Sequence, residues 1–214
     1  MISRVISDSV LDGGSTGGGV LTWEESQSHL ALYAIVSSPL FIGNDVRDGQ
    51  IQPRLLGLLK NAAMLKVNQA YTLDFAGDRI ESQAVGRELW GKPLPGAEAA
   101  AVLFNRNGTT YKCMASSPID CPCDDFANAT SGEQSMTLKF ASLGERGWLG
   151  KQVGDVDIGL ATGLSCEVTD VYGNGGAGAV SLGRFTGSWT AVVPPHGVRF
   201  LLVGNCTTAI RTDG

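Results

Sequence analysis

The feature that most constrains the fold is a change of pattern near residue 75. Before it, the stretches 23–37 and 51–59 place apolar side chains at helical spacing. After it, short apolar runs are separated by Gly, Pro and Asn, and several alternate apolar with polar residues. This second pattern is typical of strands joined by turns. The sequence therefore predicts an α/β part, residues 1–74, followed by an all-β part, residues 75–214.

The first helix has a defined beginning and end in the sequence. Thr22-Trp23-Glu24-Glu25 is a capping box, in which the Thr22 hydroxyl and the Glu25 carboxylate each accept a backbone N–H of the other residue. Pro39 excludes Ser38 from the helical region. We therefore expect a helix from Trp23 to about Ser37.

Each predicted helix is followed by a short apolar run. Leu40–Ile42 follows the first helix and Met64–Val67 follows the second. Helices that alternate with short buried strands predict parallel strands joined by crossover helices. Two such units cannot close a sheet by themselves, so we expect residues 1–74 to be an incomplete part of a larger α/β domain.

The all-β part contains runs with strand character. An antiparallel β-sandwich is expected from their number and spacing. The predicted strands are Ala100–Phe104, Met136–Phe140, Cys166–Val171, Trp189–Val193 and Val198–Val203.

Charge and hydropathy exclude two classes of partner. The 214 residues carry a net charge of −5, which argues against binding to nucleic acid or to an anionic membrane. No segment reaches the roughly 20 apolar residues of a membrane-spanning helix. We expect neither a nucleic-acid nor a membrane partner.

Three N-glycosylation sequons and five cysteines indicate an oxidising compartment. The acceptor residues are Asn107, Asn128 and Asn205, and each is expected on the surface. The N-terminus has no apolar signal-peptide core. We therefore expect a secreted or lysosomal/vacuolar glycoprotein whose signal peptide belongs to an N-terminal portion missing from this sequence.

Three of the cysteines lie close together. Cys113 is expected to bond to Cys121 or to Cys123, because a bridge within Cys121-Pro122-Cys123 would be strained. A zinc site is the alternative, but no second cysteine pair or nearby histidine supplies four ligands. Neither a metal nor an organic cofactor is expected.

Residues 21–47 carry a family resemblance. They combine the Thr-x-x-Glu opening, a helix with His29 and Tyr33-Ala34, and the run Pro39-Leu-Phe-Ile-Gly-Asn-Asp-Val-Arg47. Further matches follow in the expected order: Val67–Gln69, Glu88–Trp90, Ala101–Arg106 and Val193–Gly197. This ordered set resembles the melibiase family of α-galactosidases and α-N-acetylgalactosaminidases, glycoside hydrolase family 27.

The resemblance implies the C-terminal portion of a (β/α)₈ barrel followed by an antiparallel β-sandwich. It also implies a retaining hydrolase of terminal α-linked galactose or N-acetylgalactosamine, with two catalytic aspartates about 5 Å apart. In the family both aspartates lie upstream of the segment where this sequence begins. We therefore expect no catalytic residue in this chain and no activity from the chain alone.

Asp8 is the candidate substrate-binding residue. The family's Trp-Asn-Asp-Pro-Asp-Met-Leu signature falls on residues 4–10, and Asp8 stands at its second aspartate, which borders the sugar pocket. An ordinary loop aspartate is an equal alternative. Asp45 and Asp48 could form a carboxylate pair, but the resemblance makes Asp45 a structural residue at a strand end.

Other motifs have structural interpretations. Gly173–Gly178 matches a dinucleotide fingerprint, but the strand-like Val180–Leu182 follows it, so a hairpin loop is expected. His29 is expected to pack on the barrel wall, and His196 to lie in a turn. The Trp90, Trp148 and Trp189 side chains are expected in the sandwich core or as anchors at the domain interface, rather than on a sugar-stacking platform.

A second functional hypothesis stays open. The β-domain alone would suit a non-catalytic carbohydrate-binding or structural module. This hypothesis does not account for residues 20–69, which would have no function of their own in such a module. The sequence leaves the choice between galactose and N-acetylgalactosamine open, together with the oligomeric state.

Overall fold

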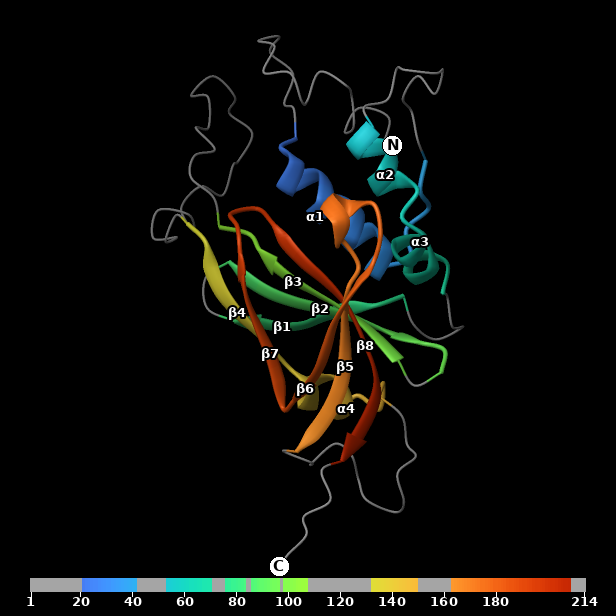
Figure 1. Ribbon diagram of the computed structural model, residues 1–214. Coiled ribbons are helices and arrows are strands. Elements are labelled where there is room, and N and C mark those ends of the chain that lie inside the picture. Colours follow the sequence, from blue (N-terminus) through green and yellow to red (C-terminus); the bar gives the residue numbers. More distant parts are fainter. Residues whose placement is uncertain are drawn as a thin grey trace, which may run out of the picture.

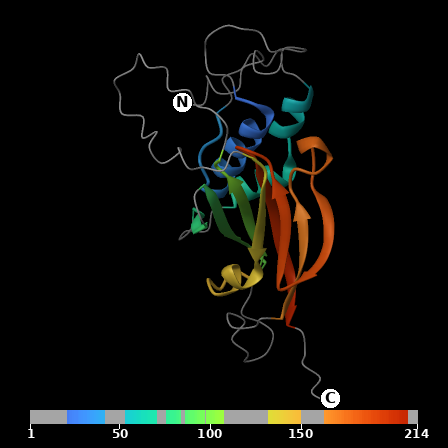
Figure 2. The same cartoon turned by 90° about the vertical axis from the view of Figure 1, so that its left-hand side faces the viewer.

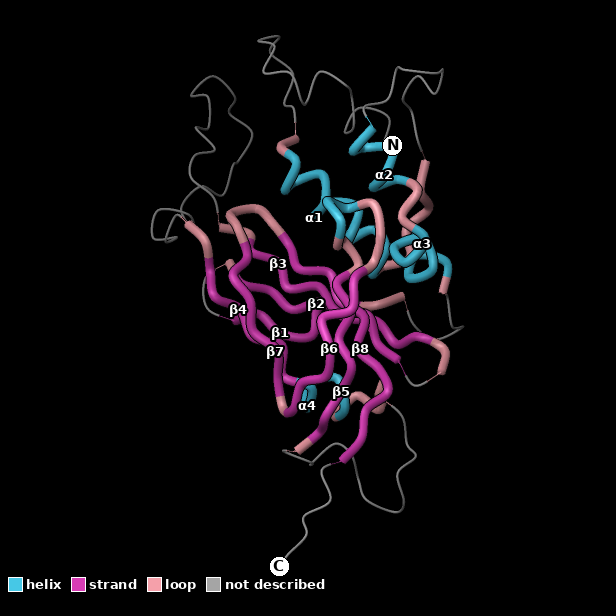
Figure 3. Tube along the Cα trace, viewed as in Figure 1, coloured by secondary structure: helices cyan, strands magenta, loops and turns pink. Residues whose placement is uncertain are grey.

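A computed structural model of the chain describes residues 21–41, 53–70, 76–83, 86–96, 98–107, 132–149 and 163–208. The structural statements that follow concern these residues. Three helices lie together at one end of the strands, as Figures 1 and 3 show. They are α1 (Trp23–Ile35), α2 (Pro53–Leu59) and α3 (Ala62–Gln69).

Two antiparallel sheets make up the β part. The larger has the strand order β1-β2-β3-β8-β5-β6, and the smaller pairs β4 with β7. The bounds are β1 Asp78–Gln83, β2 Arg87–Leu94, β3 Glu98–Asn105, β4 Gln134–Lys139, β5 Leu164–Asp170, β6 Val180–Thr186, β7 Ser188–Val193 and β8 Val198–Thr208. Two short helical segments, α4 (Phe140–Gly144) and η4 (Asn174–Gly176), lie between strands.

The larger sheet is covered on both faces. On β3, Ala100 and Val102 belong to a cluster shared with the three helices, whereas Ala101 and Leu103 belong to a cluster shared with the smaller sheet. Successive side chains of a strand point to opposite faces, which explains the division. Figure 2 shows the helices and the strands from the side. The fold is therefore a helical layer on a two-sheet β structure, with two hydrophobic cores.

The beginning of α1 confirms the predicted capping box. The Thr22 hydroxyl accepts the Glu25 N–H at 3.2 Å, and the Glu25 carboxylate accepts the Thr22 N–H at 2.7 Å. The helix ends at Ile35, close to the expected Ser37. Local side-chain chemistry decided this element.

The predicted strand Met64–Val67 is wrong, because these residues lie inside α3. The Asn61 side chain caps that helix by accepting the Met64 N–H at 3.0 Å. Leu40 and Phe41 have no strand conformation, and Ile42 lies outside the described residues. The described strands pair only antiparallel, so no parallel barrel sheet is formed within them.

The antiparallel two-sheet arrangement of the C-terminal part is confirmed. Each of the five predicted strands overlaps an observed strand, although Phe140 begins α4 and Val171 follows β5. Gly173–Gly178 joins β5 to β6, which pair antiparallel, so the hairpin-loop interpretation is also confirmed. The domain division at residue 75 stays a prediction.

Candidate functional site at the seam between helices and sheet

The first turns of α1 are bound to the connection between β7 and β8. The Glu25 carboxylate meets the His196 ring nitrogen Nδ1 at 2.8 Å, and the Ser28 hydroxyl donates to the His196 carbonyl. His196 has a positive φ of 54°, and its turn thereby presents ring and carbonyl to the same helix. We call Glu25, Ser28 and His196 the clasp.

Glu25 has two roles in the clasp, because one carboxylate oxygen closes the capping box and the other meets His196. Partial burial acts to raise the pKa of Glu25. The hydrogen bonds from Thr22 and His196, together with the charge of His196, outweigh that effect and leave the pKa below its usual value. The ionised carboxylate is therefore the form that the fold stabilises.

The opposite end of α1 is held by a buried lysine. The Lys92 ammonium group, on β2, donates to the Ser37 hydroxyl and to the Val67 carbonyl, each at 2.5 Å. Val67 lies in the last turn of α3, where carbonyls have no intrahelical partner and carry partial negative charge, so a cation is favourable there. Burial lowers the pKa of Lys92 to about 8. One side chain thus connects the sheet to the ends of α1 and α3.

Asn61 joins α3 to the loop between β5 and β6. Besides capping α3, its amide nitrogen donates to the Val171 carbonyl at 2.7 Å and to the Gly176 carbonyl at 2.8 Å. Gly176 has a φ of 93° and packs against Trp23, so only glycine suits this approach. The glycine-rich loop therefore serves as a docking surface for the helices.

Several of the described carboxylates form hydrogen bonds or ion pairs with other groups of the protein. Glu88 is buried and accepts the Trp90 indole N–H at 2.8 Å, with Arg79 and Arg106 within 3.6 Å of the same group. Other described carboxylates with protein partners are Glu25, Asp78, Glu81, Glu98, Glu167 and Asp170. These contacts hold the scaffold together. Within the described residues, no group of three or more His, Cys, Asp or Glu is placed to hold a metal.

Comparison with known proteins shows what this scaffold is similar to. A family model described as alpha galactosidase A matches residues 12–70, the segment that contains α1, α2 and α3. The α-galactosidase of Coffea arabica is 32% identical over 114 residues, which are 53% of this chain and 29% of that protein. The α-galactosidase A of Homo sapiens is 34% identical over 58% of this chain and 23% of that protein.

Over residues 12–70, this chain is similar to the α-galactosidase family.

Solved structures agree in fold. The α-galactosidase I of Mortierella vinacea superposes with a TM-score of 0.63 at 23% identity, covering 91% of this chain and 39% of that one. An α-galactosidase of Saccharomyces cerevisiae, determined with raffinose, gives 0.59 at 15% identity, over 87% of this chain and 44% of that one. The α-N-acetylgalactosaminidase of Gallus gallus is 29% identical in sequence over 83% of this chain and 33% of its own length. The chain thus spans less than half of each of these proteins.

Several predicted site residues of this chain lie outside the described residues. They are the substrate-binding candidate Asp8, the pair Asp45 and Asp48, the sequon residue Asn128, and the disulfide candidates Cys113, Cys121 and Cys123. Their predicted roles stay predictions.

The acceptor residues Asn107 and Asn205 lie within the described residues and differ from each other. Asn107 is only 2% exposed and packs against Gly86, whereas the sequence led us to expect it on the surface. Asn205 is exposed as expected, but it lies inside β8 rather than past the last strand. The burial of Asn107 follows from its position at the end of β3, where the chain folds back on the turn that contains His196.

A disulfide that the sequence did not predict joins two neighbouring strands. Cys166 on β5 is bonded to Cys206 on β8, 40 residues later. Their pairing depends on the strand order, which brings β5 beside β8. Spacing along the chain carries no signal for it.

The histidines and tryptophans have structural surroundings. His29 packs edge-on against Tyr33 at 4.4 Å, and burial lowers its pKa. Trp90 packs against the helix cluster, whereas Trp148 and Trp189 belong with the cluster between the sheets. Trp148 is buried in its cluster, whereas Trp90 and Trp189 are partly buried against theirs, so the three tryptophans form no common platform. No described helix is long and apolar enough to cross a bilayer.

Proposed function

We propose that the protein is a glycosidase of the α-galactosidase class that removes terminal α-linked galactose or α-N-acetylgalactosamine from oligosaccharides or glycoconjugates. The observation that carries this proposal is the family match over residues 12–70, the segment that forms the helical layer. Curated relatives include both α-galactosidases and an α-N-acetylgalactosaminidase. Both sugars are therefore retained as substrate classes.

The proposed role of these residues is to hold the scaffold rather than to cut the bond. Retaining hydrolysis needs two carboxylates about 5 Å apart, one as nucleophile and one as acid and base. The described carboxylates named above contact arginine, lysine, histidine, tryptophan, serine or backbone groups of the scaffold, which supports a structural role for them. The clasp and Lys92 instead position α1, which belongs to the segment that matches the family.

The substrate class has independent support from solved relatives. One α-galactosidase of the comparison was determined with raffinose, and a β-L-arabinopyranosidase from Geobacillus stearothermophilus was determined in complex with arabinose. These ligands favour a sugar or oligosaccharide substrate for this protein too. No metal or organic cofactor enters the proposed chemistry, which needs only two carboxyl groups and water.

We also propose a secreted or lysosomal/vacuolar location. The Cys166–Cys206 disulfide supports an oxidising compartment. The exposure of Asn205 in its sequon is compatible with that compartment.

A chimera tests the function. The matching part of the Coffea arabica α-galactosidase is replaced by residues 12–208 of this chain, and release from chromogenic α-galactoside and α-N-acetylgalactosaminide substrates is measured. A folded chimera that hydrolyses either substrate supports the proposal. A folded, inactive chimera with intact galactose binding would contradict it.

The 214-residue chain serves as the companion experiment. Alone, it should give only background release from both substrates. Activity that disappears in Glu25→Gln or Glu88→Gln would show instead that the described carboxylates are catalytic, and would overturn the scaffold role.

A further inference from the structure

The acceptor asparagines of two sequons can be compared in the described part of the chain. Asn205 and Thr207 are both exposed on β8, whereas the side chain of Asn107 is buried. An acceptor asparagine must reach solvent in the folded protein, because a glycan is bulky and hydrophilic. The fold therefore admits a glycan at Asn205 and opposes one at Asn107.

The backbone at Asn205 departs from regular strand geometry. The pairing of β8 with β5 is irregular here: Thr207 faces Ser165 and Gly204 faces Glu167. Asn205 has a φ of 48°, a left-handed conformation that asparagine tolerates better than most residues. On the other side of β8, pairing with β3 extends only to Val203. Asn205 thus lies beyond the part of β8 that has strands on both sides.

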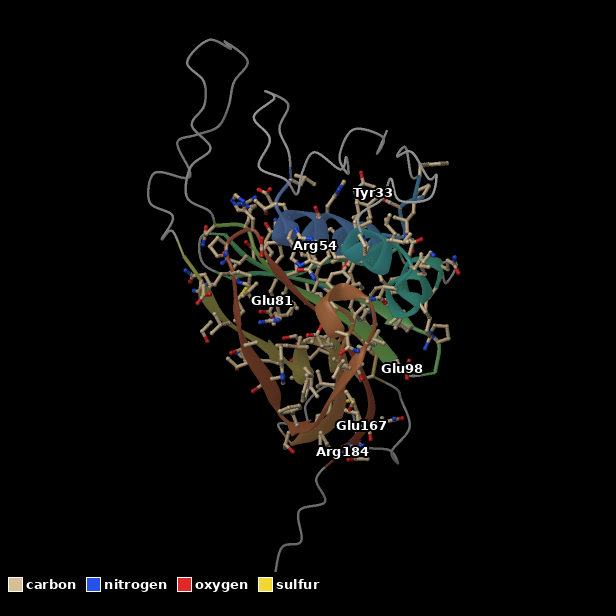
Figure 4. All side chains as sticks on the ribbon, turned by 45° about the horizontal axis from the view of Figure 1, so that its top comes forward. Tyr33, Arg54, Glu81, Glu98, Glu167 and Arg184 are labelled. Carbon is tan, nitrogen blue, oxygen red and sulfur yellow. A yellow bond between two sulfur atoms is a disulfide. The ribbon has the colours of Figure 1, made fainter. Side chains whose placement is uncertain are left out.

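The acceptor nitrogen is held by charged neighbours. The Asn205 Nδ2 donates to the Glu167 carboxylate at 2.7 Å. The Arg184 guanidinium donates to the Asn205 carbonyl at 2.9 Å and to the same carboxylate at 3.0 Å. Figure 4 shows Glu167 and Arg184 close together at the end of the sheet away from the helices. In the folded chain, the amide that would carry a glycan is already engaged.

The central residue of the same sequon is part of the disulfide. Cys206 is bonded to Cys166 on β5, with 4.1 Å between the two Cα atoms. Once this bond has formed, the segment Asn205–Thr207 is fixed against its neighbouring strand. A transferase that needs the segment extended and separate from other strands can then no longer bind it.

We propose that Asn205 carries an N-linked glycan, that Asn107 does not, and that closure of the Cys166–Cys206 disulfide ends the period in which the glycan can be attached. The proposal rests on the secretory location suggested above. In the transfer step, Nδ2 of Asn205 bonds to the anomeric carbon of a lipid-linked pyrophosphate oligosaccharide. The anomeric C–O bond breaks, its electron pair leaves with the lipid pyrophosphate, and one amide proton passes to a base of the transferase.

The modified side chain remains compatible with the fold. After transfer, Nδ2 keeps one N–H, which can still donate to the Glu167 carboxylate. The glycan then replaces the second amide hydrogen and extends into solvent, since Asn205 is exposed. The glycan and the Glu167–Arg184 ion pair can therefore coexist, although the glycan has to be attached before the Cys166–Cys206 disulfide closes.

The test uses the full chain behind a secretion signal in a eukaryotic host, with Asn128→Gln so that two sequons remain. Cell-associated and secreted protein are pooled, so that a variant that fails to fold is still counted. Site occupancy is read by peptide mass spectrometry after glycosidase treatment, which converts a glycosylated asparagine to aspartate. The host supplies the compartment, so this result does not depend on the glycosidase function or on the natural location.

One glycan is expected, lost in Asn205→Gln and in Thr207→Ala and kept in Asn107→Gln. Cys166→Ser, which leaves the sequon intact, should increase the occupied fraction at Asn205. Occupancy at Asn107, or an unmodified Asn205 even in Cys166→Ser, would overturn the site assignment. An occupied fraction that Cys166→Ser leaves unchanged would overturn the role of the disulfide.

Discussion

Glu25 shows how a single side chain can connect local and long-range structure. Its carboxylate completes the capping box of α1 and also contacts His196, 171 residues away in sequence. Because the fold lowers the pKa of Glu25, the stabilisation that it contributes is present above the unfolded-state pKa and is lost as the pH falls through the folded-state pKa.

This contact predicts an acid-dependent loss of stability. Glu25→Gln keeps an oxygen for the Thr22 N–H but removes the charge that faces His196, so it should lower the free energy of unfolding by about 1 kcal/mol at neutral pH. The difference from wild type should shrink from about pH 5 downward, as wild type protonates. Urea denaturation at a series of pH values measures it. Glu24→Gln, in the same helical turn, is the matched control and should change little.

Lys92 predicts a second rise of stability with pH, in the alkaline range. Its pKa falls from 10.5 to about 8 in the folded chain, so the unfolded chain binds more protons between these values. Stability linked to Lys92 must therefore rise as the pH increases from about 8 to about 10. The free energy of unfolding of wild type minus that of Lys92→Met should grow over this range.

Lys66→Met, at an exposed lysine of α3, is the control and should show no such growth. A flat difference for Lys92→Met would show that the Lys92 ammonium group is not the titrating group.

At the scale of elements, α3 shows where a sequence pattern was insufficient. The run Met64–Val67 is short and apolar, and such a run suits a buried strand and a buried helix equally well. The deciding signal was Asn61, a favourable N-cap three residues before Met64. By contrast, α1 carried both a capping box and a proline after its end, and its prediction was confirmed.

Asn61 provides a prediction for this element. Asn61→Ala removes the cap and leaves the Val171 and Gly176 carbonyls without their donor, so the free energy of unfolding should fall by about 3 kcal/mol. Thr22→Ala removes a cap alone, so it should cost about 1 kcal/mol. Thermal or urea denaturation of the two variants compares them. Equal losses would mean that the contacts of Asn61 with the loop contribute nothing.

Contacts between distant elements were beyond sequence reasoning. The capping box and the turn around His196 were each expected, but their contact depends on how β7 and β8 approach α1. The Cys166–Cys206 bond depends on strand order in the same way. Local chemistry thus predicted the ends of elements, whereas topology decided which functional groups meet.

At the scale of the whole molecule, the helices and the larger sheet share one core. Ala34 and Ile35 of α1, Leu58 of α2, and Val102 and Phe200 of the sheet all belong to the same buried cluster. Removal of the helices would expose this apolar face of β3 and β8. Although the sequence suggests separate α/β and β parts, their stabilities should therefore be coupled.

Ala34→Glu tests this coupling. Ala34 is fully buried, so the new carboxylate would lie in the shared cluster without a partner, and the free energy of unfolding should fall by about 3 to 5 kcal/mol. Because the cluster includes β3 and β8, amide hydrogen exchange should accelerate in those strands as much as in α1. Ala62→Glu makes the same change at an exposed first position of α3, where a negative charge is favourable, and should leave exchange unchanged. If Ala34→Glu accelerates exchange in α1 alone while β3 and β8 stay protected, the sheet is stable without its helical layer and the two parts unfold independently.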